Sequence, residues 1–160
     1  MKQLVTSRTL TMGAVVLLLS LAIGAVAGIG GYTFIYAKGW SYMTDDPRAC
    51  ANCHVMEEQY TAWMRSSHRS VAACNDCHTP PGLSKWVAKA SNGYHHSYAF
   101  TSGKFPDVIQ ITPKNLEIVE GRCRGCHEDI VHTVDTSHDG DERTACTTCH
   151  ARVGHANREQ

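Results

Sequence analysis

Outside its N-terminal segment, the chain has few large aliphatic side chains. Residues 38–160 number 123, and leucine, isoleucine, valine and phenylalanine together supply only 16 of them, or 13%. This content is below what a globular domain ordinarily needs for a core, and by itself it would predict disorder. A folded domain here therefore requires another source of apolar surface.

The chain also lacks net charge and strand-like patterns. The formal net charge is +0 at pH 7, with 15 basic and 15 acidic residues. A balanced chain gives no indication of nucleic acid or of a strongly charged substrate. No convincing run alternates polar with apolar residues, which argues against a sheet. We therefore expect a mainly α-helical fold with long connections.

All eight cysteines belong to four copies of Cys-x-x-Cys-His. In each copy the two thiols are spaced to add to the two vinyl groups of one haem, and the histidine is placed to bind its iron. Paired zinc ribbons have similar cysteine spacings but need no histidine after every pair. The sequence therefore predicts four covalently bound haem c groups, whose apolar rings replace the missing core. The attachment residues are Cys50, Cys53, Cys74, Cys77, Cys123, Cys126, Cys146 and Cys149.

The motifs form two pairs, in residues 50–78 and 123–150, joined by the linker 79–122. The pairs are nearly equal in length, which is typical of an internal duplication. Ser66-Ser67-His68 in the first pair also has a counterpart in the second, Thr136-Ser137-His138. We interpret the domain as two dihaem repeats.

The N-terminal segment is long and apolar. The 29 residues between Arg8 and Lys38 are uncharged, whereas about 20 suffice for a membrane-spanning helix. Ala25-Val26-Ala27 resembles a signal-peptide cleavage site, but apolar residues continue beyond it, which favours an uncleaved anchor over residues 1–37. Lys2 and Arg8 precede the span without any acid. This asymmetry predicts a single-pass protein of the cytoplasmic (inner) membrane, with its N-terminus in the cytoplasm and the haem domain, residues 38–160, in the periplasm.

Local patterns predict three helical regions in the haem domain. Residues 54–68 are rich in helix formers. From Leu83, apolar residues recur every three or four positions through Tyr98, which predicts an amphipathic helix. A loop then covers roughly residues 101–112. Thr112-Pro113 supplies an N-cap and a first-turn proline for a short helix that we expect to stop at Gly121.

Further side chains are needed to complete the haem irons. A multihaem electron carrier needs a second axial ligand on most irons, and at least two histidines outside the motifs should supply it. Met56 is another candidate, although methionine also packs well against rings. For each histidine taken alone, a surface role or a bond to a haem propionate is an equally good interpretation. The six histidines outside the motifs are His68, His95, His96, His132, His138 and His155.

The order of these features resembles the NapC/NirT family of cytochromes. The anchor is followed by Cys-x-x-Cys-His-x-Met (residues 50–56), Ser67-His68, the second motif, two later motifs and His155 near the C-terminal end. Asp45-Asp46-Pro47 and Lys89-Ala90 extend the likeness over almost the whole chain. Within the family, the chain is most similar to the small, membrane-anchored subunits of cytochrome c nitrite reductases.

The resemblance implies an electron-transfer subunit that oxidises menaquinol. Its electrons would pass through four haems to a periplasmic partner, the pentahaem catalytic subunit of a nitrite reductase, in a hetero-oligomer. Nitrite chemistry belongs to that partner, because in this class the catalytic haem is marked by Cys-x-x-Cys-Lys, which this chain lacks. Two alternatives stay open: a quinol dehydrogenase for another periplasmic reductase, and a membrane-tethered electron shuttle without a quinol site.

The resemblance also implies residue roles. Met56 rather than His54 would bind the first iron. On the second haem, His78 would be completed by a lysine of the partner subunit. The remaining ligand pairs would be His127 with His155 on the third haem and His150 with His68 on the fourth.

In the family a lysine, and an aspartate seven residues later, flank the quinol site. Lys89 matches the lysine, but His96 stands at the position of the acid. An imidazole there can accept the quinol proton or bind the first iron, and we favour the proton acceptor. Trp40, Tyr42 and Trp86 suit the membrane–water interface, and packing against haem is an equally good interpretation of these aromatic residues.

Overall fold

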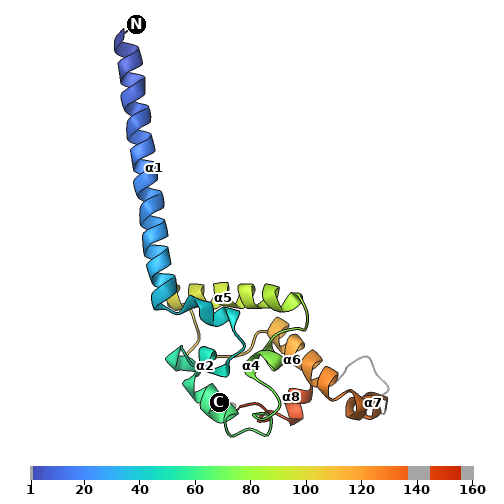
Figure 1. The fold of residues 1–160 in the computed structure, drawn as a ribbon. Coiled ribbons are helices and arrows are strands. Elements are labelled where there is room, and N and C mark those ends of the chain that lie inside the picture. Colours follow the sequence, from blue (N-terminus) through green and yellow to red (C-terminus); the bar gives the residue numbers. More distant parts are fainter. Residues whose placement is uncertain (1, 137–144, 156–160) are drawn as a thin grey trace. The chain divides into compact units, whose positions relative to one another are not determined.

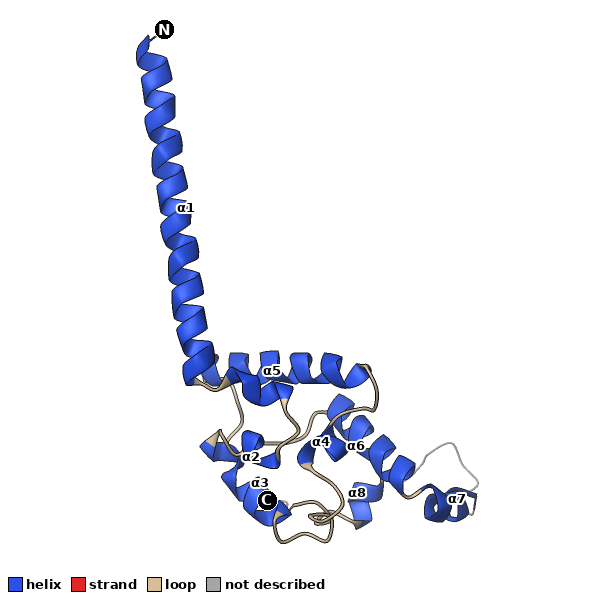
Figure 2. Ribbon diagram, in the orientation of Figure 1, coloured by secondary structure: helices blue, strands red, loops and turns tan. Residues whose placement is uncertain are grey.

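The computed structural model describes residues 2–136 and 145–155 (Figure 1). These residues form helices joined by turns and loops, and no strand occurs among them (Figure 2). The mainly helical fold predicted from the sequence is confirmed. The chain divides into two compact units, Met1–Trp40 and Ser41–Gln160, so the division falls three residues after the expected end of the anchor.

The first unit is dominated by one long helix, α1 (Lys2–Tyr36). Its stretch Thr11–Tyr36 has 26 residues, all of them exposed, and includes an 18-residue window with a mean hydropathy of 2.4. Twenty-six helical residues extend about 39 Å, more than the roughly 30 Å of a bilayer's hydrocarbon layer. A helix that is apolar all round and uncovered by protein has the composition of a membrane span.

The second unit consists of short helices around one longer one. Its elements are η1 (Gly39–Met43, which begins in the first unit), α2 (Pro47–Cys50), η2 (His54–Met56), α3 (Glu57–Trp63), α4 (Cys74–His78), α5 (Ser84–Ser102), α6 (Pro113–Cys126), α7 (Glu128–Thr136) and α8 (Cys146–Cys149). Motif 1 lies across α2 and η2, motif 2 forms α4, motif 3 ends α6 and motif 4 forms α8.

Two helix termini follow the expected local chemistry. The hydroxyl of Thr112 accepts a hydrogen bond from the backbone N–H of Asn115 at 3.4 Å, and Pro113 is the first residue of α6. Helix α5 ends at Gly103, whose φ of 66° is left-handed. Glycine adopts this conformation without the steric cost that a side chain would add. The predicted amphipathic helix, the loop after it and the N-cap of α6 are therefore confirmed.

Two predicted helix ends were wrong. Helix α6 continues through Gly121 to Cys126, because Gly121 keeps a negative φ and the third motif is itself helical. A glycine ends a helix only where it takes the left-handed conformation. In the 54–68 stretch, α3 stops at Trp63 before two serines, Ser66 and Ser67. Serine side chains bond locally and compete with the helix, and the Ser67 hydroxyl lies 3.2 Å from Nδ1 of His68.

The elements that carry the motifs touch one another in chain order: α2 contacts α4, α4 contacts α6, and α6 contacts α8. Arg122 Nε of α6 donates to the Asp76 carbonyl of α4 at 2.7 Å. Glu120 of α6 accepts from the backbone N–H of Cys146 at 2.6 Å and of Thr147 at 3.0 Å. Glu120 thus caps the N-terminus of α8 from another helix. Polar bonds therefore link α4 to α6 and α6 to α8.

The burial pattern confirms that the polypeptide has little core of its own. Among the described residues no hydrophobic side chain is buried, and the buried polar residues are Thr79, 5% exposed, and Lys89, 6% exposed. A domain of this size ordinarily encloses several aliphatic and aromatic side chains. Polypeptide packing alone therefore does not account for this fold.

Candidate functional site

Three of the four motifs place their two cysteines three residues apart on one helical turn. These pairs lie in α4, at the end of α6 and in α8. Residues three apart on a helix lie on the same face, so both thiols of each pair can reach one ligand. All eight cysteines are among the described residues, and none forms a disulfide. The arrangement supplies the paired free thiols that thioether attachment of haem needs.

The first motif has a different backbone. Cys50 ends α2, Cys53 is extended with φ −94° and ψ 120°, and η2 then runs from His54 to Met56. Met56 is half-buried, whereas His54 is exposed. This motif therefore presents a methionine and a histidine on one short turn, and the methionine is the better covered of the two.

The described histidines outside the motifs include two that lie beside motif histidines. The ring centroids of His68 and His127 are 6.0 Å apart at 66°, and those of His78 and His155 are 6.0 Å apart at 10°. The resemblance implied other partners, His150 for His68 and His127 for His155. These ring contacts differ from that pairing, and the assignment of iron ligands stays a prediction.

The remaining histidines are placed as follows. His95 and His96 are in α5 and His132 is in α7. His138 and the second copy of the serine–histidine pattern lie outside the described residues, so the proposed internal repeat also stays a prediction.

Haem fits these residues on two grounds. A large flat apolar group would supply the burial that the polypeptide lacks. His78 has the required chemical form, because burial, and after it the neighbouring His155, lowers its pKa to about 4. Its imidazole is therefore neutral at pH 7, and neutral imidazole is the form that binds a metal.

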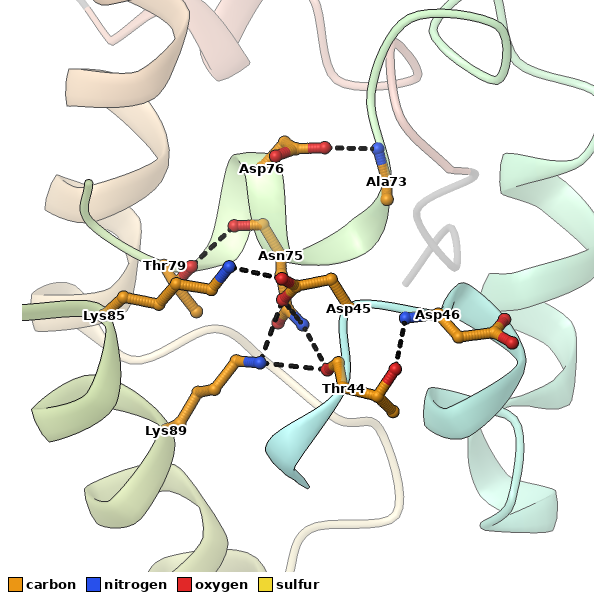
Figure 3. A network of polar contacts seen from close by, with 9 residues as sticks. All are labelled: Thr44, Asp45, Asp46, Ala73, Asn75, Asp76, Thr79, Lys85 and Lys89. Atoms are coloured by element: carbon orange, nitrogen blue, oxygen red, sulfur yellow. Dashed lines mark hydrogen bonds and ion pairs between the residues drawn. The ribbon is translucent and has the colours of Figure 1, made fainter. Parts of the chain in front are cut away.

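A polar network centred on Asp45 joins the segment before the first motif to α4 and α5 (Figure 3). Lys89 Nζ donates to Oδ1 of Asp45 and to the Thr44 carbonyl, both at 2.9 Å. Lys85 Nζ donates to Oδ2 of Asp45 at 2.5 Å, and Asn75 Nδ2 to Oδ1 at 2.8 Å. The hydrogen bonds from Lys85 and then from Lys89 lower the Asp45 pKa to about 2. Asp45 is therefore ionised at neutral pH and compensates the buried charge of Lys89.

Two turns beyond Lys89 on α5, His96 meets an aromatic residue of η1. The Tyr42 hydroxyl lies 3.0 Å from Nδ1 of His96. Burial, and after it the charge of His95, lowers the pKa of His96, which is therefore neutral at pH 7. Burial raises the pKa of Tyr42, and in the haem-free chain the thiols of Cys53 and then Cys50 are near enough to act electrostatically in the same direction. The structure thus brings Tyr42 near the first motif and against His96.

Sequence reasoning singled out Lys89 and His96 but missed the side chains that hold them. Asp45 entered only as part of a family pattern, and Tyr42 only as an aromatic residue for the interface. Asp45 lies 44 residues before Lys89 in the chain. The available signal was an acid shortly before the first haem motif and two lysines one turn apart in an otherwise weakly charged helix.

We expect Asp45→Asn to destabilise the holoprotein by about 2 kcal/mol, because Lys89 would keep a buried charge without its counterion. Breaking a fully buried pair costs about 3–5 kcal/mol. The smaller figure reflects that the Asp45 side chain is 52% exposed and therefore partly screened by water. Thermal denaturation followed by circular dichroism measures the change.

Asp107→Asn is the matched control for this prediction, since Asp107 is exposed in the loop between α5 and α6. It should leave stability nearly unchanged. Adding Lys89→Met to Asp45→Asn should recover part of the loss, because the double variant buries no uncompensated charge. Equal stability of Asp45→Asn and wild type would contradict the proposed pairing.

Helical turns carrying cysteine pairs and adjacent histidines, in a domain with no buried apolar side chain among its described residues, define a c-type cytochrome. The comparison with known families identifies the group. The chain belongs to the NapC/NirT cytochrome c family, whose N-terminal-region model matches residues 10–160. Membership of a cytochrome c family implies covalently bound haem c.

Two proteins similar to this chain are called NrfH. The cytochrome c-type protein NrfH of Wolinella succinogenes is 36% identical over 148 residues, covering 85% of this chain and 84% of the relative. The cytochrome c nitrite reductase subunit NrfH of Nitratidesulfovibrio vulgaris is 32% identical over 133 residues, covering 82% and 80%. A chain in a crystal structure of the cytochrome c nitrite reductase NrfHA complex bound to the HQNO inhibitor is 28% identical, with a TM-score of 0.63, covering 88% of this chain and 93% of that one.

Proposed function

We propose that this protein is the membrane-anchored tetrahaem subunit of a cytochrome c nitrite reductase, which oxidises menaquinol and passes the electrons to a pentahaem catalytic subunit. The observation that carries this proposal is the similarity to the two NrfH proteins, which extends over at least 80% of each chain compared. The similar fold of a chain from an NrfHA complex supports the same partner.

Four haem groups would be held by the four cysteine pairs. Bound haem supplies one-electron acceptors, whose potential depends on the axial ligands and on burial. We propose Met56 as ligand of the first iron in preference to His54, in line with its greater burial. The other proposed ligands are His68, His78, His127, His150 and His155.

The proposed quinol site lies on the face of α5 that carries Lys89 and His96. Quinol oxidation releases two protons as well as two electrons, so the site needs a proton acceptor. His96 meets this need, because its lowered pKa keeps it neutral and able to accept a proton at pH 7. Lys89 is a positioning residue. Its bonds to Thr44 and Asp45 hold the segment before the first motif against α5.

The proposed orientation follows from the charges around α1. Lys2 and Arg8 precede the apolar stretch, and positively charged residues favour the cytoplasmic side. The second unit would then lie in the periplasm, outside the cytoplasmic membrane. This location suits a protein that must meet both membrane quinol and a periplasmic reductase.

The decisive experiment uses the complex as it exists in cells. The protein is solubilised in mild detergent from native membranes of anaerobically grown cells, and the proteins that co-purify with it are identified. Nitrite consumption is then assayed with menaquinol as electron donor. We expect a pentahaem subunit to co-purify and nitrite to be consumed. If menaquinol reduces the haems but nitrite does not reoxidise them in a complex with active partner subunit, the nitrite assignment fails. Failure of menaquinol to reduce them would leave the electron shuttle.

A further inference from the structure

Tyr42 lies directly against the proposed proton acceptor. Its hydroxyl is 3.0 Å from Nδ1 of His96, and the two ring centroids are 6.1 Å apart at an angle of 49°. One turn before His96, a Cβ at Gly93 would lie 3.4 Å from the Tyr42 ring. The Tyr42 ring thus lies over the backbone of α5 at Gly93, with its hydroxyl at one particular nitrogen of the imidazole.

We propose that Tyr42 is a positioning residue for quinol oxidation, which accepts a hydrogen bond from Nδ1–H of His96 and thereby leaves Nε2 as the basic nitrogen that faces the quinol. This inference rests on the proposed function. It assigns a tautomer and an orientation to His96 and adds a residue that the family resemblance did not assign to the quinol site.

The two tautomers of His96 predict opposite chemistry. A neutral imidazole carries one N–H donor and one lone-pair acceptor, and the hydrogen bond made by one nitrogen fixes the role of the other. If the Tyr42 hydroxyl donated to Nδ1, Nε2 would carry the proton and could not act as the base. If Tyr42 accepts from Nδ1–H, Nε2 has the lone pair. Only the second arrangement keeps the same hydrogen bond after Nε2 takes a proton.

His96 takes the first of the two quinol protons. One quinol O–H bond breaks, its proton forms a new N–H bond at Nε2, and the imidazole becomes imidazolium, while one electron would leave through bound haem. The imidazolium then releases its proton to water, so the same nitrogen can take the proton of the second O–H bond as the second electron leaves. Nδ1–H continues to donate to the Tyr42 oxygen throughout, so the imidazole need not turn during the transfer.

The surrounding charges agree with this role. Among the described residues, Tyr42 of η1 is the titratable group seen against His96 from another element. On α5 itself the titratable neighbours are the adjacent His95 and, two turns back, Lys89. Lys89 is compensated by Asp45. The pKa of Tyr42 is raised, so its phenol keeps its proton at neutral pH. Tyr42 is therefore a neutral acceptor that does not itself compete for the quinol proton.

The test is Tyr42→Phe in the purified holocomplex, with Tyr98→Phe as matched control, because Tyr98 is an exposed tyrosine of α5, the helix that carries His96. Menaquinol-dependent haem reduction should fall about five- to tenfold in Tyr42→Phe, the effect of one lost hydrogen bond. In the pH profile of this rate, the acidic limb should shift to lower pH. The reason is that the His96 imidazolium loses a hydrogen-bond acceptor, which lowers the pKa of His96. Haem spectra should stay unchanged, and Tyr98→Phe should behave as wild type.

A second readout is independent of activity. Infrared difference spectra between wild type and Tyr42→Phe, recorded with ¹⁵N-labelled histidine, should show loss of the Nδ1–H tautomer of one imidazole. A limb shifted to higher pH would mean that Tyr42 donates to Nδ1, and this would overturn the proposal, as would an unchanged rate and unchanged limb. Each of these results requires that wild type be reduced by menaquinol. If it is not, the proposed function fails first.

Discussion

Replacement of His96 by alanine should lower the rate of menaquinol-dependent haem reduction by at least about 100-fold, while the haem spectrum stays that of wild type. General bases typically contribute 10²- to 10⁴-fold to a rate. Among the described residues, His96 is the proton acceptor that we propose for the quinol. Stopped-flow mixing with menaquinol, followed at the haem absorbance, measures the effect. Reduction by dithionite, which needs no proton acceptor, should proceed as in wild type.

His95→Ala provides the matched control for this variant. Nδ1 of His95 lies 2.7 Å from the Ser91 carbonyl of its own helix, so its imidazole is engaged away from Tyr42. Removing it should leave the rate close to that of wild type. If His96→Ala instead converts one haem to a high-spin form, His96 is an iron ligand, and the role of proton acceptor is excluded.

The pH dependence of the wild-type rate tests whether the pKa of His96 is lowered. His96 accepts a proton only when it is neutral, so the rate should rise with pH through its pKa and level off above it. Because burial, and then the charge of His95, lowers that pKa below its usual 6.5, the plateau should already be reached at neutral pH. A rate that still rises steeply above pH 7 would contradict this assignment.

The features predicted correctly from the sequence are those fixed by local chemistry. Covalent attachment requires two cysteines at one spacing and a histidine beside them, so the four motifs can be recognised without a structure. The amphipathic helix α5 follows from its apolar period, and the start of α6 follows from Thr112 and Pro113. The apolar stretch within α1 follows from its length and composition.

The features that could not be predicted depend on pairs of residues far apart in the chain. Tyr42 and His96 are 54 positions apart, and Glu120 reaches α8 across a separation of 26. Neither pairing leaves a periodic signal in the sequence. The continuation of α6 past Gly121 was missed for a related reason, because whether a glycine ends a helix depends on the backbone conformation that its surroundings impose.

These long-range pairs have a common consequence for the site. The short segment 42–45 supplies Tyr42 to His96 and both Thr44 and Asp45 to Lys89, and it ends just before α2 and the first motif. One face of α5 is thereby fixed against the start of the haem domain at two points, two turns apart. The position of the proposed proton acceptor and that of the first cysteine pair are set by the same contacts, as the proposed oxidation of quinol beside the first haem would require.

The haem-free chain should have no folded second unit. Ordering a residue costs roughly 1–2 kcal/mol in backbone entropy, and apolar burial normally offsets this cost. Among the described residues no hydrophobic side chain is buried, so without haem the offset is missing. A variant with all eight cysteines changed to alanine, purified in detergent, should show no near-ultraviolet circular dichroism from fixed aromatic residues and no cooperative thermal transition.

Residual helicity in that variant should come mainly from α1. A membrane-spanning helix satisfies its backbone hydrogen bonds within itself and needs no haem, whereas α2, α4 and α8 have only four or five residues each and are far too short to form alone. Limited proteolysis distinguishes an unfolded from a folded second unit. If it is unfolded, detergent should protect the apolar stretch 11–36 while residues 41–160 are cut throughout. A native-like spectrum, or protection of the second unit, would mean that polar contacts such as the Asp45 network suffice to fold it.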